Sequence, residues 1–321
     1  MIIKVTLSII LTLSSLLAMA SPSNFSEAKV ELRKFIYHDQ TNNGTIYCGC
    51  SWTWAGASGG VIDLPSCGYK IAEQPNRAKR LEWEHIVPAS NFGRARQCWQ
   101  HGGRANCEAT DPVFNKMESD MHNLAPSIGE VNADRSNFNY GELSSSSRNY
   151  GSCPFKVDFA NRTAEPRDEV KGKVARVYFY MSDRYNLRLS ESQQKLMMAW
   201  NKSFPVTANE KLIDSRVAQK MGHHNPFVTG QSQWELGHKN SGAGLVEKNA
   251  SNALPSPALA TAGVNPKGLN SVSIHGNKKS FIYHVANSCP DYSKISPQNV
   301  VEFSNEASAE AAGFRKARNC K

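Results

Sequence analysis

The sequence predicts a mixed α+β protein in which a small irregular sheet carries the functional residues and helices pack around it. Short apolar runs separated by turn-forming residues occupy 47–128, which is typical of short strands. By contrast, 169–221 repeats apolar residues at helical spacing in three consecutive segments. A stretch rich in Asn, Ala, Gly, Pro and Ser then predicts a flexible linker at 237–271, followed by a small α+β module at 272–321.

The first 20 residues predict a secretory signal peptide. Lys4 precedes a short apolar run at 5–17, and small residues lead up to Ala20. A transmembrane anchor is the alternative, but it needs roughly 20 apolar residues, more than this run supplies. We therefore expect cleavage after Ala20, a secreted protein (periplasmic or extracellular) and no membrane span in the mature chain.

Composition agrees with export. The chain has 321 residues, eight cysteines and a formal net charge of +9. An even number of cysteines in an oxidising compartment indicates disulfides rather than free thiols. The positive charge suits an acidic partner such as nucleic acid, an anionic surface or cell-wall polyanion. Because the charge is spread along the chain, an ordinary solvated surface explains it equally well.

The first elements in chain order are a short amphipathic helix at 26–37 and two short strands with a glycine-containing turn within 47–69. Trp52 and Trp54 alternate as one face of a strand does, which favours core packing over base stacking. An arginine-rich loop follows at 91–107, and Cys98 and Cys107 are close enough in sequence to close it.

A predicted strand ending at Pro88 places Glu84 and His85 side by side. Adjacent strand residues point to opposite faces, so the two side chains have different tasks. A second strand is predicted at 122–125, followed by a helix in which Ser127 and Glu130 form a capping-box pattern. Asn132 lies inside that helix, where asparagine is unfavourable, which indicates a role for its side chain.

Further along, the serine-rich segment 141–164 is predicted to be loop. Helices are then expected at 169–185, 190–204 and 207–221, with their apolar stripes, Leu212 included, facing the core. In the last module we expect strands at 281–285 and 300–303 and a helix at 304–312. Cys289 and Cys320 bracket this module and favour a disulfide, although the two cysteines together with His284 could instead hold a metal.

The polar residues of the central segment have the chemistry for phosphodiester hydrolysis. The oxygens of Glu84 and Asn132 are ligands suited to Mg²⁺. A neutral His85 can take a proton from water. An arginine in the cysteine-closed loop, Arg104, has the planar donors that bind a phosphate.

Several ordered motifs then resemble the bacterial endonuclease I family, secreted or periplasmic non-specific nucleases with a ββα-metal (His-Me finger) site. The motifs are CGC at 48–50, EWEHIVPA at 82–89, RQCW at 96–99, MESDMHNL at 117–124, GEVNADR at 129–135, KVDF at 156–159, RVYFYM at 176–181 and NPFV at 225–228. The resemblance covers roughly 26–228 within a domain expected to span 21–236.

This resemblance implies cleavage of DNA, and usually RNA, to products with 5′-phosphates. It implies His85 as general base, Glu84 and Asn132 as ligands of Mg²⁺ (or another divalent cation such as Mn²⁺ or Ca²⁺), and Arg104 as the phosphate contact. Glu118 lies in a matching motif and receives a supporting catalytic role. We expect a monomer acting without dependence on nucleotide sequence.

The chain departs from the family in lacking one further cysteine pair, whose first position corresponds to Lys211. The six cysteines that remain before the linker allow three bridges, which we assign as Cys98–Cys107, Cys50–Cys67 and Cys48–Cys153.

The final module is similar to the metal-binding module of the bacterial Ada repair protein but lacks four cysteines, which argues against zinc. Attachment to DNA or a surface is a hypothesis that rests on its basic residues, which are Lys278, Lys279, Arg315, Lys316 and Arg318.

Two other functions fit parts of the sequence. A non-catalytic, secreted DNA-binding or uptake protein could use the same scaffold, but it would not need Glu84, His85, Arg104 and Asn132 together. A phosphodiesterase or phosphatase for small molecules would need a closed pocket, whereas an arginine-rich loop suits an open groove for a polymer.

Overall fold

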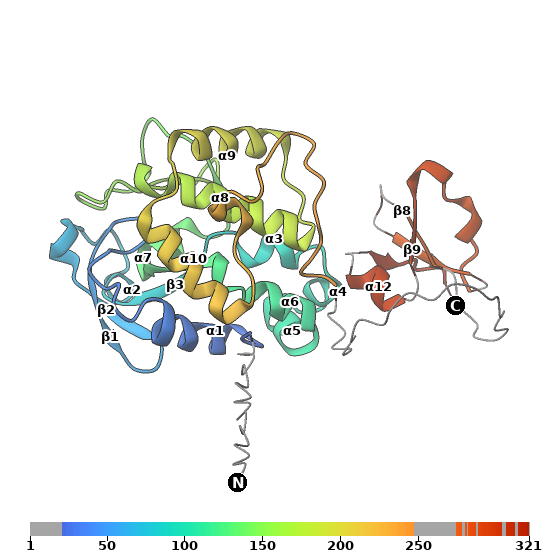
Figure 1. The fold of residues 1–321 in the computed structure, drawn as a ribbon, viewed down its shortest axis with the longest axis horizontal. Helices are drawn as coiled ribbons and strands as arrows, with labels where there is room; N and C mark the ends of the chain where they lie inside the picture. Colours follow the sequence, from blue (N-terminus) through green and yellow to red (C-terminus); the bar gives the residue numbers. More distant parts are fainter. Residues whose placement is uncertain are drawn as a thin grey trace, which may run out of the picture.

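The computed structural model describes residues 21–246 and, with short gaps at 278–279, 281, 287, 304–305 and 312–313, residues 274–320 (Figure 1). The expected signal peptide at 1–20, most of the expected linker, and Lys278 and Lys279 lie outside the described residues. The architecture is mixed, with many helices around several small sheets, as the sequence predicts. No helix in the described ranges is long and apolar enough to cross a membrane.

A strand–strand–helix unit forms the centre of the main domain. Strand β3 (Leu81–His85) pairs antiparallel with β4 (Leu124–Ile128), which places Glu84 opposite Ala125 and His85 opposite Leu124. Helix α7 (Gly129–Arg135) follows β4 directly. Every residue of β4 is buried, so the register that positions Glu84 and His85 is fixed by packing on both sides of the sheet.

The expected capping box at this helix is wrong. Ser127 belongs to β4, and the residue before α7 is Ile128, which provides no side-chain cap. The carboxylate of Glu130 instead accepts hydrogen bonds from Tyr69 and from the backbone N–H groups of residues 72–74. The Glu130 carboxylate, which the local pattern assigned to the N-terminus of α7, is therefore occupied by hydrogen bonds from residues distant in sequence.

Beside β3 lies the predicted hairpin of β1 (Trp52–Ala55) and β2 (Gly59–Ile62), attached by a bridge between Val61 and Arg80. Trp52 and Trp54 pack edge to face, 5.5 Å between ring centroids, in agreement with the core role. Gly60 has no room for a side chain, since a Cβ atom would lie 2.8 Å from the Thr53 carbonyl oxygen.

The arginine-rich segment is not a loop but a run of short helices. They are α3 (Ala89–Gly93), α4 (Gln97–Gln100), α5 (Gly103–Thr110) and α6 (Pro112–Glu118). Asp111 explains part of this structure, because its carboxylate caps α6 at Val113 and Phe114 and also pairs with Arg96. The short 3₁₀ turn Met121–Asn123 then leads into β4.

The helical half is close to expectation. It contains α8 (Asp168–Tyr185), α9 (Glu191–Ser203), α10 (Ala208–Met221) and α11 (Pro226–Thr229). Helices α8 and α9 approach so closely that a Cβ on Gly172 would lie 2.1 Å from the Phe204 carbonyl oxygen. Leu212, expected in the core, is 41% exposed.

Other elements differ from the sequence-based expectations. The N-terminal helix is α1 (Phe25–Glu31) continued by a π-helical turn, Leu32–Ile36. The segment expected to be loop contributes β6 (Lys156–Asp158) and β7 (Thr163–Glu165) to a three-stranded sheet completed by β5 (Asn139–Tyr140). The remaining short helices of this domain are Leu64–Cys67 and α2 (Pro75–Ala78).

Residues 238–245 fall within the range expected for the linker, yet they contact the main domain. The carboxylate of Asp183 on α8 accepts hydrogen bonds from His238 and from the hydroxyl and backbone N–H of Ser241. Leu245 packs against the main core. A single half-buried acid on a helix has thus fixed a segment whose composition indicates flexibility.

The C-terminal module has its own small core around Tyr283 and Phe314. Its sheet has the order β10-β8-β9-β11, where the strands are β8 (Ile274–Asn277), β9 (Ile282–Val285), β10 (Val300–Phe303) and β11 (Arg315–Lys316). Helix α12 (Glu306–Ala311) and two 3₁₀ turns, Tyr292–Lys294 and Pro297–Asn299, complete it.

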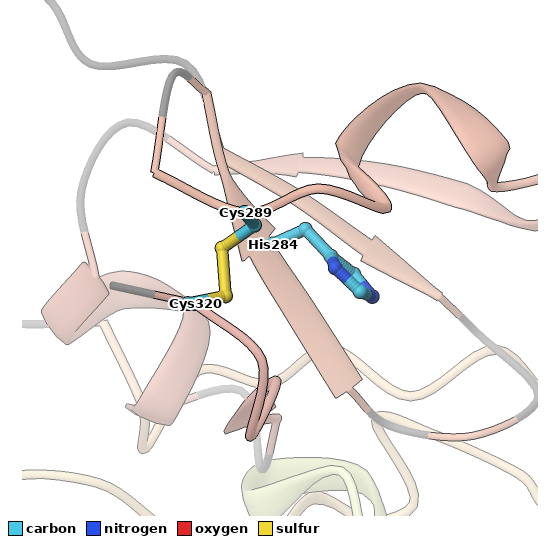
Figure 2. Close-up of side chains that lie close together, drawn as sticks. All are labelled: His284, Cys289 and Cys320. Atoms are coloured by element: carbon cyan, nitrogen blue, oxygen red, sulfur yellow. A yellow bond between two sulfur atoms is a disulfide. The ribbon is translucent and has the colours of Figure 1, made fainter.

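The cysteines form four disulfides, and they are the four pairs named above: Cys48–Cys153, Cys50–Cys67, Cys98–Cys107 and Cys289–Cys320. Figure 2 shows the last of these with the imidazole of His284 beside it. The ligand atoms of these three residues lie within 4.8 Å of one another, but both sulfur atoms are already bonded. In this oxidised form the cysteines of the module are not available as thiolate ligands.

Candidate active site

The end of β3 opens into a cleft of about 580 Å³. Among the residues that line it are four of the five predicted site residues, namely Glu84, His85, Arg104 and Asn132. They come from β3, α5 and α7, elements that are separated in sequence but line the same cleft. The fifth residue, Glu118, is fully buried behind them at the end of α6.

His85 is buried and held by one hydrogen bond. Its Nε2 lies 2.9 Å from the backbone carbonyl oxygen of Glu118. A carbonyl oxygen can only accept, so Nε2 carries the hydrogen and, in the neutral ring, Nδ1 has a free lone pair. Burial lowers the pKa of His85 to about 3, and the positive charge of Arg104 acts in the same direction. The ring is therefore neutral at physiological pH.

Glu84 is held from one side of its carboxylate. Oε1 accepts a hydrogen bond from the Tyr47 hydroxyl at 2.6 Å and lies 3.3 Å from Nε of Arg135. No described residue bonds to Oε2, and the side chain lines the cleft. Burial raises the pKa of Glu84 to about 7, opposed by Arg135 and the Tyr47 hydrogen bond. A cation in the cleft would favour the ionised form of this acid.

Asn132 is oriented by a residue that the sequence analysis overlooked. Its Nδ2 donates to Oε2 of Glu82 at 2.9 Å, which leaves the amide oxygen Oδ1 free of that contact. Arg77 and Arg80 hold the same carboxylate. Burial raises the pKa of Glu82, but the hydrogen bonds from Arg77, Asn132 and Arg80 outweigh it and lower the pKa overall. Glu82 precedes Glu84 by two residues, a strand spacing that could have indicated a shared face.

Arg104 extends from α5 toward the cleft and is 42% exposed at its side chain. Its Nε donates to Oε1 of Glu118 at 2.5 Å and to Glu108 at 2.9 Å. Burial raises the pKa of Glu118 to about 7, although the charge of Arg104 opposes this. Glu118 thus binds His85 through its backbone and Arg104 through its side chain.

Comparison with known proteins places the chain in a family. The model of the endonuclease I family matches residues 24–231. The chain belongs to the endonuclease I family. The match includes all five predicted site residues and stops before the C-terminal module.

Curated members of this family are similar over most of their own length. Endonuclease-1 of Buchnera aphidicola subsp. Baizongia pistaciae (strain Bp) is 47% identical over 199 residues, which is 61% of this chain and 80% of the relative. A periplasmic deoxyribonuclease of Aeromonas hydrophila is 42% identical over 229 residues, 71% of this chain and 94% of the relative. An extracellular deoxyribonuclease of the same species is 44% identical over 210 residues, covering 65% and 89%.

The donor set of this endonuclease I site fits a hard divalent cation. Glu84 Oε2 and Asn132 Oδ1 are oxygen atoms that other described residues leave unbonded, on two elements that line one cleft. Mg²⁺ often takes one or two protein oxygens and completes its shell with water and phosphate oxygens. The cysteines of the main domain are all bonded in disulfides, so none of its described residues offers a thiolate that would favour a softer metal.

Other cleft residues were missed because no local pattern marks them. Arg135 is fully buried and donates to the carbonyl oxygens of His85, Ile86 and Ser136. It follows Asn132 by three residues in α7, so only a tertiary contact reveals its role beside Glu84. Phe25 and Lys29 of α1 also line the cleft, about 60 residues before His85 in sequence.

Proposed function

We propose that this secreted endonuclease hydrolyses phosphodiester bonds of DNA, and also of RNA, without dependence on nucleotide sequence and leaves 5′-phosphates. The relatives named periplasmic and extracellular deoxyribonuclease support the DNA substrate and export. The observation that carries the mechanism is the hydrogen bond from Nε2 of His85 to the Glu118 carbonyl oxygen. It leaves the proton-accepting nitrogen of a buried, neutral imidazole at a cleft that also holds a carboxylate and an arginine.

His85 is the general base in this proposal. Nδ1 takes a proton from a water molecule, and the water oxygen attacks phosphorus. The depressed pKa keeps the ring unprotonated before the step, and the Glu118 carbonyl holds it in the required tautomer. As the imidazolium forms, both ring nitrogens carry hydrogen, and the hydrogen bond to the carbonyl becomes charge-assisted.

Glu84 and Asn132 are the residues that would hold Mg²⁺, and Mn²⁺ and Ca²⁺ prefer the same oxygen ligands. A bound divalent cation supplies charge neutralisation at a phosphate oxygen and at the leaving oxygen. Tyr47 and Arg135 fix Oε1 of Glu84, and Glu82 fixes the amide of Asn132. Both ligand side chains are therefore oriented before any cation arrives.

Arg104 contacts the phosphate. Its guanidinium is exposed at the cleft while Glu118 and Glu108 hold it by Nε, so its remaining N–H groups can donate to phosphate oxygens. Glu118 supports this contact and does not itself touch substrate. Phosphate contacts carry no direct sequence information, which is consistent with a non-specific enzyme of net charge +9.

The test is cleavage of supercoiled plasmid by the oxidised mature protein with Mg²⁺, with EDTA, and in the variants His85→Ala and His101→Ala. His101 is an exposed histidine of the same domain and serves as the matched control. We expect EDTA to abolish cleavage and His85→Ala to reduce it about 10²- to 10⁴-fold. Plasmid bound but uncut by the wild type would favour the non-catalytic DNA-binding protein, and wild-type activity in His85→Ala would contradict the assigned base.

A further inference from the structure

The N-terminal helix α1 contributes a phenyl ring to the inside of the catalytic cleft. The ring of Phe25 lies against the imidazole of His85, 4.6 Å between centroids. The guanidinium carbon of Arg104 lies 5.3 Å from the same ring centroid, and Nζ of Lys29 lies at 4.7 Å. One residue of α1 therefore contacts both the group that takes the proton and the group that binds the phosphate.

His85 needs such a contact because its hydrogen bonds leave one motion free. The single hydrogen bond from Nε2 to the Glu118 carbonyl oxygen holds one corner of the ring, but the ring can still rock about its Cβ–Cγ bond. Phe25 on one side and Phe92, 6.3 Å away between centroids, restrict that rotation. The direction of the Nδ1 lone pair thus depends on the two phenyl rings.

The contact with Phe25 acts on Arg104 in a different way. Both of its ion pairs use Nε, so the rest of the guanidinium is not fixed by hydrogen bonds to described residues. A cation near an aromatic ring is attracted to the electron-rich face of the ring. Phe25 therefore stabilises the exposed end of Arg104 without occupying the N–H groups that a phosphate would use.

Phe25 is itself fixed from both sides. Before it, the Pro22 carbonyl oxygen accepts a hydrogen bond from the buried hydroxyl of Ser119, which follows Glu118, at 3.1 Å. Asn24 caps α1 by accepting from the Glu27 N–H at 3.0 Å. After it, Ala28 and Leu32 are fully buried in the main core.

We propose that Phe25 is a positioning residue for the hydrolysis, and that the segment 22–29 is an integral part of the active site. The ring holds the His85 imidazole and the Arg104 guanidinium in the relative orientation that proton transfer and phosphate binding require. This inference rests on the proposed roles of His85 and Arg104. The rival role for an aromatic ring in this cleft is a platform on which a nucleobase stacks.

The experiment measures kcat and KM of Phe25→Ala, Phe25→Tyr, Phe35→Ala and His85→Ala on a short DNA duplex. Phe35 is a phenylalanine of the same N-terminal segment that is 39% exposed and does not line the cleft. We expect Phe25→Ala to lower kcat about tenfold with little change in KM, which is the effect of losing an aromatic contact at the reacting group. Phe25→Tyr should restore most of kcat, and Phe35→Ala should leave it unchanged.

A second substrate separates positioning from base stacking. The duplex is compared with one in which the nucleotides flanking a single cleavable bond are abasic. Positioning predicts the same tenfold loss for Phe25→Ala on both substrates, because the ring acts on His85 and Arg104. A loss that disappears on the abasic substrate would overturn the proposal in favour of a stacking platform.

The variants also separate this inference from the proposed function. If His85→Ala retains wild-type kcat, the general base is wrong and the role of Phe25 fails with it. If His85→Ala is inactive while Phe25→Ala has wild-type kcat, the positioning role alone is refuted. Should Phe25→Ala fail to fold, Phe25→Leu takes its place, and a full wild-type kcat in that variant would also refute the role, because leucine provides no aromatic face for Arg104.

Discussion

Replacing Glu118 by Gln removes the charge behind Arg104 while keeping the shape of the side chain. The carboxylate is fully buried and its Oε1 lies 2.5 Å from Nε of Arg104, whereas Oε2 is buried without a hydrogen-bond partner in the described part of the chain. The amide can still accept from the Arg104 cation, but the attraction between two opposite charges is lost. Two unit charges about 4 Å apart attract by about 4 kcal/mol at the effective dielectric near a protein surface. Because the Arg104 side chain is 42% exposed, solvent screens part of this attraction, and the expected loss is about 1–2 kcal/mol.

If Arg104 binds the transition state, that loss appears in kcat/KM as a reduction of about five- to thirtyfold. Global stability should change little, because the variant also removes a buried charge whose desolvation raises the pKa of Glu118 to about 7. The assay is the initial rate on a fluorescently labelled duplex, with the melting temperature measured alongside. Glu108→Gln is the matched control: Glu108 is an exposed partner of Arg104, and exposed pairs contribute about 0–1 kcal/mol.

A double-mutant cycle decides whether Glu118 acts through Arg104. In the Arg104→Ala background, Glu118→Gln should have almost no further effect on kcat/KM, because the two residues form one unit. Additive losses would refute the reasoning and assign Glu118 a separate function. Its backbone contact with His85 is unchanged by the substitution, so that contact cannot account for a loss.

Three further predictions concern other parts of the chain. Tyr47→Phe removes a 2.6 Å hydrogen bond to Oε1 of Glu84. We expect the free energy of unfolding to fall by about 1 kcal/mol and half-maximal activity to require a several-fold higher Mg²⁺ concentration. An unchanged Mg²⁺ titration would contradict the role given to Tyr47. Burial lowers the pKa of His223 to about 4 from its ordinary 6.5. The unfolded chain therefore binds a proton at His223 more readily than the folded protein, and the free energy of unfolding decreases as the pH falls from 6.5 to 4. His223→Gln should therefore gain melting temperature relative to the wild type across that interval, and a constant difference would refute the shift. Deleting 272–321 should weaken retention of DNA without changing kcat on a short duplex, as measured by mobility shift in EDTA; unchanged retention would argue against DNA attachment by the module.

The elements that the sequence predicts well have local causes. The limits of α9 and α10 follow from the caps Ser190, Thr207 and Gly222, which act within one helical turn of the helix end. Glu84, His85 and Asn132 could be selected as candidates from their residue types and positions, and the structure brings all three to one cleft. Their residue types are informative without knowledge of the fold.

The features that the sequence does not predict depend on tertiary contacts. Strands β5 to β7 are two or three residues long, too short for an alternating pattern to be visible. Glu130 matches a local capping pattern, but its carboxylate accepts hydrogen bonds from Tyr69 and from the backbone of 72–74 instead. Phe25 reaches His85 only because the fold brings α1 to the cleft, and an aromatic residue in an amphipathic helix carries no signal of such a contact.

Arg135 joins the elements on one side of the cleft by buried hydrogen bonds. Its guanidinium ties the carbonyl oxygens that end β3 to the end of α7, and it lies beside Glu84. The opposite half, with Arg104, consists of short helices around the Cys98–Cys107 disulfide. Local opening in proteins follows such differences in burial and hydrogen bonding. Under mild denaturation we therefore expect amide hydrogen exchange to accelerate first in α4 and α5, so that Arg104 loses its position while Glu84 and Asn132 keep theirs.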